Sequence, residues 1–371
     1  STLAIFEKGS LSVGRYFDIP VKIHWSFGYI IFYVIYTGYT DNMGVAGALW
    51  FGLFILSLFL CVVLHEYGHA LAARRYGVKT LDIILTPLGG IARLMKMPDK
   101  PIQELVVALA GPAVNVVIAT IIFLVLYVGM GVNPIFHIDE NLYFFNGNPI
   151  KFFSVLMVVN VTLIIFNLLP VFPMDGGRVL RALLAMKWKK VTATLIAARI
   201  GQVCSLAFIG LGLYSGNFIL ALIGIFIFQG AYMEYRQTKA ESILQSTTIE
   251  GLGLSDFQYF QHDDKVTNAR ELLNYTQQPF FPVYKDGNVL GSISREQILA
   301  SPDPYVTLDN LELNAVISIS HNAVWMECYN IFLQGKTDLC LLIRDGIPGG
   351  ILDKYTFYQN MVDKKLLRQK K

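Results

Sequence analysis

The chain has few charged residues for its length. Asp, Glu, Lys and Arg make up 15% of the 371 residues, whereas hydrophobic residues make up 54%. A typical soluble domain carries about 25% charged residues, so this composition excludes an ordinary soluble enzyme and indicates a membrane protein. The net charge is only +3, and the basic residues are scattered along segment ends rather than gathered in one patch. The sequence therefore predicts no nucleic-acid partner.

Cysteine is also scarce. The four cysteines are Cys61, Cys204, Cys328 and Cys340. Their separations match neither a paired framework nor the usual spacing of cysteine metal ligands. We therefore expect no disulfide framework, and the fold must be held by other means.

Long apolar runs are what the sequence does contain. A membrane-spanning helix needs about 20 predominantly apolar residues. Six segments meet this description, at residues 24–40, 47–73, 103–130, 151–172, 191–214 and 217–233. The expected fold class is an α-helical polytopic membrane domain with six spans, followed by a polar α/β tail.

The connections between these segments differ in charge. Lys and Arg cluster after the second and fourth spans, whereas residues 41–46, 131–150 and 215–216 contain neither. Positive residues mark cytoplasmic loops. We therefore expect a multi-pass protein of the cell membrane with both termini in the cytoplasm.

A short polar motif interrupts the second apolar run. Residues 65–69 read His-Glu-Tyr-Gly-His, so His65 and His69 lie four positions apart and share one face of a helix. Two histidines at this spacing can bind one Zn²⁺ ion, with Glu66 beside the open coordination position. Ionisable residues inside a bilayer segment are costly, which favours a functional role. The motif predicts a zinc site within the membrane.

A catalytic zinc ion takes three protein ligands, so a third ligand must come from elsewhere. The fourth span ends in a stretch with two prolines and two glycines, which should break the helix around Asp175. The second and fourth spans run in the same direction, and this places His65, His69 and Asp175 at similar depth. Asp175 is therefore the candidate third ligand. The alternative is an ordinary helix end with an aspartate at the membrane interface.

Three motifs together resemble the site-2 protease family of intramembrane zinc metalloproteases. They are residues 65–69, the Gly-Pro-Ala-Val-Asn sequence at 111–115 and the segment 167–177, and the resemblance covers about residues 1–235. It implies that His65, His69 and Asp175 bind the metal and that Glu66 is the catalytic base. It also implies that Asn167 binds substrate or stabilises the transition state. Asn115 is either a substrate-binding residue or an interhelical packing residue.

A hairpin is expected between the second and third spans. Residues 81–86 and 91–97 flank a turn at 87–90 that contains Gly89 and Gly90. A helical substrate must unwind before hydrolysis, and a strand edge could pair with the unwound segment. We expect this hairpin to dip into the membrane beside the metal and to bind substrate at Gly89 and Gly90. The alternative is a connecting loop on the membrane surface.

The polar tail contains an internal repeat. An Asp-Gly pair at 286–287, followed by Gly291, recurs at 345–346 and Gly350 with a constant offset of 59 residues. Each copy reads as strand, helix, strand, turn, strand, helix. The expected domains are a membrane metalloprotease domain at 1–235, a linker at 236–244, a first repeat at 245–303 and a second repeat with a basic tail at 304–371.

The two copies resemble a tandem pair of cystathionine-β-synthase-type (CBS) domains. Such pairs often bind adenine nucleotides and often dimerise, so the resemblance implies an adenine nucleotide as a second cofactor and a homodimer as an assembly. The match to the family's nucleotide ligands is poor, and Ser294 and Asp353 are the remaining candidates. The alternative is a dimerisation or substrate-docking module that binds no nucleotide.

Two functions follow from these features. The first is an intramembrane zinc endopeptidase, which hydrolyses a peptide bond within or near a transmembrane segment of a membrane-bound regulatory protein. In this function Glu66 takes a proton from the attacking water, and the CBS pair modulates activity or substrate access. The second is a metal transporter or channel regulated by the CBS pair. The role of Glu66 distinguishes these two functions, because a protease of this kind requires a general base and a transporter does not.

Overall fold

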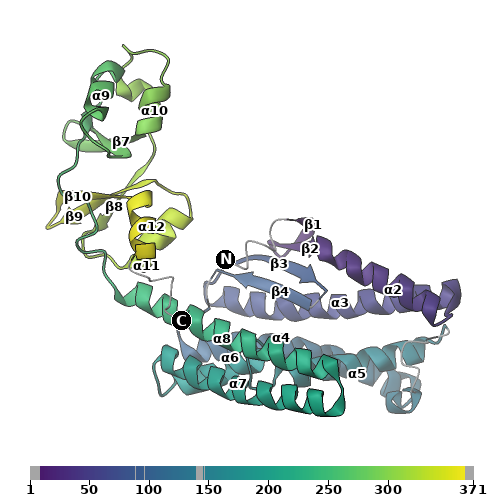
Figure 1. Ribbon diagram of the computed structural model, residues 1–371. Coiled ribbons are helices and arrows are strands. Elements are labelled where there is room, and N and C mark those ends of the chain that lie inside the picture. Colours follow the sequence, from purple (N-terminus) through teal and green to yellow (C-terminus); the bar gives the residue numbers. More distant parts are fainter. Residues whose placement is uncertain (1–8, 88, 96, 139–144, 146, 364–371) are drawn as a thin grey trace. The chain divides into compact units, whose positions relative to one another are not determined.

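The computed structural model describes residues 9–87, 89–95, 97–138, 145 and 147–363 (Figure 1). The chain divides into two compact units, Ser1–Tyr235 and Arg236–Lys371. The basic tail expected after residue 363 lies outside the described residues. Each unit is described by itself.

The first unit consists of apolar helices and one small sheet. Its strands are β1 (Ser10–Tyr16), β2 (Ile19–His24), β3 (Thr80–Thr86) and β4 (Gly89–Leu94). Its helices are α2 (Gly28–Thr40), α3 (Gly44–Arg75), α4 (Pro101–Leu124), α5 (Pro149–Asn167), α6 (Asp175–Ala185), α7 (Lys190–Ser215) and α8 (Phe218–Ser246). Short helical turns lie at Trp25–Phe27, Val125–Gly129 and Pro134–His137.

Five helices in the described part of the chain are long and apolar enough to cross a membrane. They are α3, α4 with the turn that follows it, α5, α7 and α8. The expected polytopic helical fold is confirmed, but its first span differs. Residues 24–40 hold a short turn and the 13-residue helix α2, whose length of about 20 Å is less than the roughly 30 Å thickness of a bilayer core.

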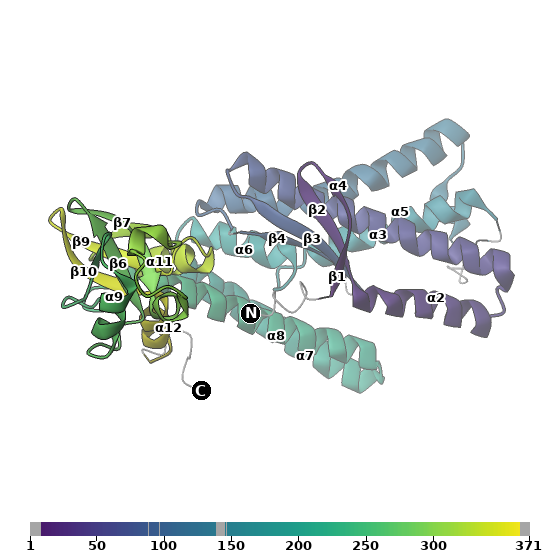
Figure 2. The same ribbon diagram turned by 90° about the horizontal axis from the view of Figure 1, so that it is seen from above.

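A four-stranded sheet lies along one side of α3, with strand order β1-β2-β3-β4 (Figure 2). The β3–β4 pair is the hairpin that the sequence predicts, with antiparallel register from Thr86 opposite Gly89 onwards. β2 and β3 are parallel, and α2 and α3 supply the crossover that parallel strands require. Apolar residues of the sheet such as Val21 and Ile83 pack against Phe59 of α3. The hairpin is therefore held directly over the helix that carries the His-Glu-Tyr-Gly-His motif.

Helices α3 and α4 approach each other closely at small residues. A Cβ atom on Gly68 would lie 2.6 Å from the backbone oxygen of Ala110, and one on Gly111 would overlap the imidazole of His69. Only glycine permits this approach, because any other residue would push the backbones apart. The close contact brings the α4 backbone against the two histidines.

The helix break near Asp175 covers seven residues. α5 ends at Asn167 and α6 begins at Asp175, and residues 168–174 form the irregular segment between them. This segment folds back over the first turn of α6, so a Cβ atom on Gly176 would lie 2.1 Å from the Leu169 oxygen. The glycine pair after Asp175 is what allows α6 to start at this point.

The second unit contains the two repeated copies. The first has β5 (Phe260–Gln261), α9 (Val266–Leu273), β6 (Phe280–Lys285), β7 (Asn288–Ser294) and α10 (Arg295–Ala300). The second has β8 (Val316–Ser320), α11 (Trp325–Leu333), β9 (Leu339–Arg344), β10 (Ile347–Asp353) and α12 (Lys354–Asp363). A short helical turn at Leu308–Asn310 lies between them. The segment 236–244, expected as a linker, is the last part of α8.

The repeat is visible in the backbone as well as in the sequence. β6 and β9 begin 59 residues apart, and so do β7 and β10. In both copies the Asp-Gly turn has positive φ at both residues, 50° and 78° at Asp286 and Gly287 and 51° and 80° at Asp345 and Gly346. This is the backbone that a two-residue hairpin requires. The α/β tail that the sequence predicts is thus present as two copies of one arrangement.

Candidate metal centre

Three side chains from two helices converge at the candidate metal centre. His65 and His69 come from α3, and Asp175 is the first residue of α6. The two Nε2 atoms lie 3.1 Å apart, and the Asp175 Oδ2 atom lies 3.2 Å from His65 Nε2 and 3.1 Å from His69 Nε2. All three residues are buried. The structure therefore brings together the three side chains that the sequence predicts as metal ligands.

The outer nitrogen of each histidine has a partner on another helix. His69 Nδ1 donates to the backbone oxygen of Val107 at 2.7 Å, and His65 Nδ1 donates to Asn115 Oδ1 at 2.5 Å. A carbonyl oxygen can only accept, so the proton of each neutral ring lies on Nδ1. Both Nε2 atoms then present lone pairs to one point. These outer contacts are the kind that fix the tautomer of metal-binding histidines.

The converging atoms fit a divalent cation. Two Nε2 lone pairs and a carboxylate oxygen repel one another at 3.1–3.2 Å unless a positive charge lies between them. Tetrahedral bonds of about 2.0–2.1 Å place zinc ligands roughly 3.3 Å apart. The donor set of two imidazoles and one carboxylate also matches catalytic zinc sites. The arrangement thus suits Zn²⁺ bound by three protein ligands.

Glu66 faces the hairpin rather than the metal ligands. Its Oε2 atom accepts a hydrogen bond from the backbone nitrogen of Ala92 on β4 at 2.9 Å. Ala92 lies opposite Ile83 in the β3–β4 register, but its N–H points away from β3 and towards Glu66. Glu66 therefore lies at the outer edge of β4, next in sequence to a metal ligand.

The two glycines of the hairpin have separate structural roles. A Cβ atom on Gly90 would lie 2.8 Å from Glu66 Cγ and 3.0 Å from Val62 Cγ1, so this strand can approach α3 only with glycine here. Gly89 has a φ of 126°, which is unfavourable for other residues. Both residues thus shape the edge of β4 beside Glu66.

A buried ion network holds the hairpin in register. The Asp82 carboxylate of β3 accepts from Arg93 Nε and Nη2 at 2.5 and 2.6 Å, and Lys22 Nζ of β2 lies 2.7 Å from Asp82 Oδ2. Burial by itself raises the pKa of Asp82, but the hydrogen bonds and charges of Arg93 and Lys22 outweigh burial and hold the pKa below its ordinary value. The network joins three adjacent strands.

The two asparagines named from sequence lie in different surroundings. Asn115 is fully buried, accepts from His65 and donates to Asn160 Oδ1 at 2.9 Å. This is the interhelical packing role that the sequence left as an alternative. Asn167, the last residue of α5, is partly exposed, and its side chain makes no hydrogen bond to any other described residue. Its amide is therefore available to a substrate.

Sequence reasoning missed several partners of the site. Val107 supports His69 only through its backbone, so no residue type could reveal it. Asn160 supports Asn115 across a helix interface. Arg181 of α6 is buried in an ion cluster with Glu104 of α4, although the sequence suggests only a charge in a cytoplasmic connection. The available signal was a row of polar and small residues, at 104, 111 and 115, on one face of an apolar helix.

The two nucleotide-binding candidates act as helix caps. Ser294 Oγ accepts from the Gln297 nitrogen at 3.1 Å, and Gln297 Oε1 accepts from the Ser294 nitrogen at 2.8 Å. Asp353 Oδ1 accepts from the nitrogens of Tyr355 and Thr356, and its Oδ2 accepts from Thr356 Oγ1 at 2.6 Å. Both side chains are engaged at the N-termini of α10 and α12.

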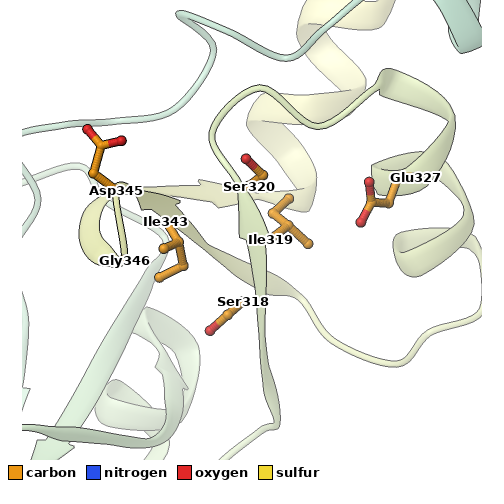
Figure 3. Close-up of a pocket in the computed structure, with 7 residues that line it drawn as sticks. All are labelled: Ser318, Ile319, Ser320, Glu327, Ile343, Asp345 and Gly346. Atoms are coloured by element: carbon orange, nitrogen blue, oxygen red, sulfur yellow. The ribbon is translucent and has the colours of Figure 1, made fainter.

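A hollow of about 400 Å³ lies elsewhere in the second copy (Figure 3). Its lining includes Ser318 and Ser320 of β8, Glu327 of α11 and Asp345 of the hairpin turn. The two carboxylates give the hollow a negative charge, which opposes a phosphate ligand. Neither Ser294 nor Asp353 lines it.

Comparison with known proteins identifies the first unit. Residues 53–209 match the model of peptidase family M50. A zinc metalloprotease of Methanocaldococcus jannaschii is 34% identical over 284 residues, which cover 76% of this chain and 78% of that protein.

Two solved structures are also similar. A site-2 protease from M. jannaschii has 35% identity and a TM-score of 0.44, and the match covers 61% of this chain and 95% of that one. The CBS domain of a bacterial CNNM/CorC-family Mg²⁺ transporter has 11% identity and a TM-score of 0.31, covering 35% of this chain and 84% of that one.

Proposed function

Because the chain belongs to peptidase family M50, the site-2 protease family of zinc metalloproteases, we propose that it hydrolyses a peptide bond within or near a transmembrane segment of a membrane-bound regulatory protein. The observation that carries this proposal is the convergence of His65, His69 and Asp175 beside Glu66. A protease of this kind needs a bound metal, a general base and a surface for an unwound substrate, and each has a candidate in the first unit.

The metal ligands are His65, His69 and Asp175. Zn²⁺ held there would act as a Lewis acid that polarises the substrate carbonyl and acidifies water. Val107 and Asn115 hold the two imidazoles with Nε2 facing the metal position. Glu66, adjacent in sequence to His65, acts as the general base that takes a proton from the attacking water and returns it to the leaving amine.

The substrate binds along the outer edge of β4. This strand is at the end of the sheet, and its Ala92 N–H already points outwards to Glu66. An extended peptide segment can pair with such an edge through its backbone, which leaves its side chains free to vary. Gly90 lets this edge lie close to Glu66, and no atom lies within 4 Å of a Cβ position at Gly89, which leaves room for a substrate at Gly89. The cut peptide bond would then lie next to the general base.

Asn167 is the candidate for binding the substrate carbonyl. It lies at the end of α5, eight positions before Asp175, the first residue of α6, and the residue is partly exposed. A side-chain amide that donates to a developing oxyanion typically contributes about 3–4 kcal/mol to the transition state. We assign this role to Asn167 rather than to Asn115, whose amide is engaged by His65 and Asn160.

The second unit modulates activity or substrate access. Its two copies form a CBS-like pair, which we place in the cytoplasm with both chain termini because Lys and Arg cluster after the second and fourth spans. An adenine nucleotide and a homodimer contact are the two candidate inputs to this pair. Ser294 and Asp353 would have to give up their helix-capping hydrogen bonds to bind a nucleotide. Dimerisation requires no such loss, so we favour it as the signal that regulates the enzyme.

The proposal is tested with purified full-length protein in detergent and candidate single-span membrane proteins as substrates. Wild type should cleave, a chelator should abolish cleavage, and added Zn²⁺ should restore it. Glu66→Gln should retain zinc and lose cleavage by a factor of about 10²–10⁴, because only the general base is removed. If Glu66→Gln cleaves at the wild-type rate, the proposed mechanism is wrong. Membership of a peptidase family argues against the transporter reading, and ion flux through vesicles that carry Glu66→Gln would test it directly.

A further inference from the structure

Helix α6 begins with Asp175, and it also carries a buried arginine, Arg181. Arg181 is 2% exposed and lies between two carboxylates from other helices. Its Nε and Nη2 atoms lie 2.6 Å from Glu104 Oε1 of α4, and its Nη1 atom donates to Glu234 Oε1 of α8 at 2.5 Å. The guanidinium also lies over the ring of Phe172, 5.3 Å from its centroid. We call Glu104, Arg181 and Glu234 the buried ion cluster.

The same face of α4 supports all three metal ligands. Glu104, Val107, Gly111 and Asn115 lie at intervals of three and four residues, so they share one face of the helix. Val107 and Asn115 hold the two histidines, and Gly111 lets the α4 backbone approach them. Glu104 continues this row by one turn and holds Arg181. α4 is thus the frame against which both ligand-bearing helices are aligned.

A short helix needs two fixed points to define the direction of its first side chain. The first point on α6 is the contact of Gly176 and Gly177 with the segment before it. The second is Arg181, six residues from Asp175, which places it about 9 Å along the helix and about 120° around it. A contact at this position resists rotation of α6 about its own axis. Rotation would move the Asp175 carboxylate away from the two imidazoles.

Arginine is suited to this task. Its planar guanidinium group can donate hydrogen bonds to two carboxylates in fixed directions, which a lysine ammonium cannot do. A buried charge whose partner is lost is costly, so the cluster strongly favours the one arrangement in which both carboxylates meet the guanidinium. Glu234 adds a dependence on α8, because movement of α8 would remove one of the two carboxylates.

We propose that Arg181 is a positioning residue that orients Asp175 towards the metal through its ion pairs with Glu104 and Glu234. The inference rests on the metal-binding part of the proposed function. It assigns no chemical step to Arg181, which touches neither the metal position nor the substrate edge. It predicts that loss of the cluster lowers metal affinity in protein that is still folded.

The test measures zinc affinity by competition with a chelator, for purified full-length protein in detergent. We expect Arg181→Gln to lower the affinity by about 10–100-fold, the range observed when supporting partners of metal ligands are removed. Arg181→Lys should give an intermediate loss. Glu234→Gln, at the exposed side of the cluster, should give a smaller loss and serves if Arg181→Gln does not fold. The visible spectrum of the Co²⁺-substituted variants should change, because the geometry of the carboxylate ligand changes.

The matched control is Leu184→Ala on the same helix. Leu184 packs against the Phe172 and Ala197 cluster, so its loss weakens the packing of α6 without touching the ion cluster. This variant should melt at a lower temperature and keep the wild-type zinc affinity and Co²⁺ spectrum. Equal loss of affinity in Leu184→Ala and Arg181→Gln, or unchanged affinity in both Arg181→Gln and Glu234→Gln, would overturn the proposal. Absence of zinc binding by the wild type would instead reject the proposed function.

Discussion

Glu66 Oε2 accepts a hydrogen bond from the backbone N–H of Ala92, 2.9 Å away. This hydrogen bond links the helix that carries the candidate metal ligands to the edge strand of the sheet. It fixes the direction of the Glu66 carboxylate, and it marks the point at which a paired substrate strand would meet the general base. In the proposed mechanism, this backbone contact aligns the substrate edge with the general base.

Removing the Ala92 N–H should weaken catalysis without removing the metal. In Ala92→Pro the donor is lost, but the pairing of β4 with β3 survives because this N–H does not face β3. We expect kcat/KM to fall by about 100-fold, since a misaligned base loses much of its effect, and zinc content to stay at the wild-type level. Ala92→Gly keeps the N–H and is the control. Cleavage by Ala92→Pro at the rate of Ala92→Gly would contradict this account.

Local sequence patterns were enough to predict which three side chains converge at the candidate metal centre. The spacing of His65 and His69 defines a helix face, and prolines with glycines before Arg178 mark the helix break that brings Asp175 to the same depth. The hairpin and the repeat could also be predicted, because turn glycines and a constant offset are properties of the sequence alone.

Contacts between elements that are distant in the chain could not be predicted in this way. Asn115 could have packed against any neighbouring helix, and only the rotation of α4 selects His65 as its partner. The sequence places Arg181 in a charged cytoplasmic connection. Its burial could not be predicted, because its two carboxylate partners lie 77 and 53 residues away in the chain. Strands β1 and β2 were missed because their pairing depends on β3, which lies beyond two helices.

Gly111→Ala should abolish metal binding. The added Cβ atom would lie 2.2 Å from His69 Nε2 and 2.7 Å from His65 Nε2, so either α4 must retreat or both imidazoles must rotate. Either response separates the three ligand atoms, and zinc content after purification should fall to background. Gly210→Ala is the matched control, because Gly210 is also helical and has open space at its Cβ position. It should keep full zinc content and gain up to about 1 kcal/mol of stability. Zinc retention by Gly111→Ala would show that the helices do not pack as described.

The Asp82 ion network should make the stability of the first unit depend on pH in the acidic range. The pKa of Asp82 is lower in the folded protein than in the unfolded chain, so the unfolded state binds more protons as the pH falls. The stabilisation is complete above the ordinary pKa of about 3.9 and is lost as the pH falls through the lower, folded pKa.

Asp82→Asn tests this pH dependence. The variant should melt well below the wild type at pH 7. The gap in melting temperature should narrow below about pH 4, where Asp82 in the unfolded wild-type chain begins to bind protons. Asp41→Asn, an exposed substitution, is the control. A gap between wild type and Asp82→Asn that stays constant from pH 7 to pH 3 would exclude the network as its cause.

Asp353 should contribute to stability as a helix cap whether or not a nucleotide binds. Its carboxylate accepts from the two backbone nitrogens at the start of α12 and from the Thr356 hydroxyl. Replacing such a cap by alanine typically costs about 1 kcal/mol, so Asp353→Ala should accelerate backbone hydrogen exchange in the first turn of α12. The exposed substitution Lys336→Ala should leave that exchange unchanged. If added adenine nucleotide protects the α12 amides in wild type but not in Asp353→Ala, the carboxylate exchanges its cap for a ligand. If nucleotide changes neither protein, Asp353 serves α12 alone, and the proposed regulation would have to act through dimerisation or substrate docking.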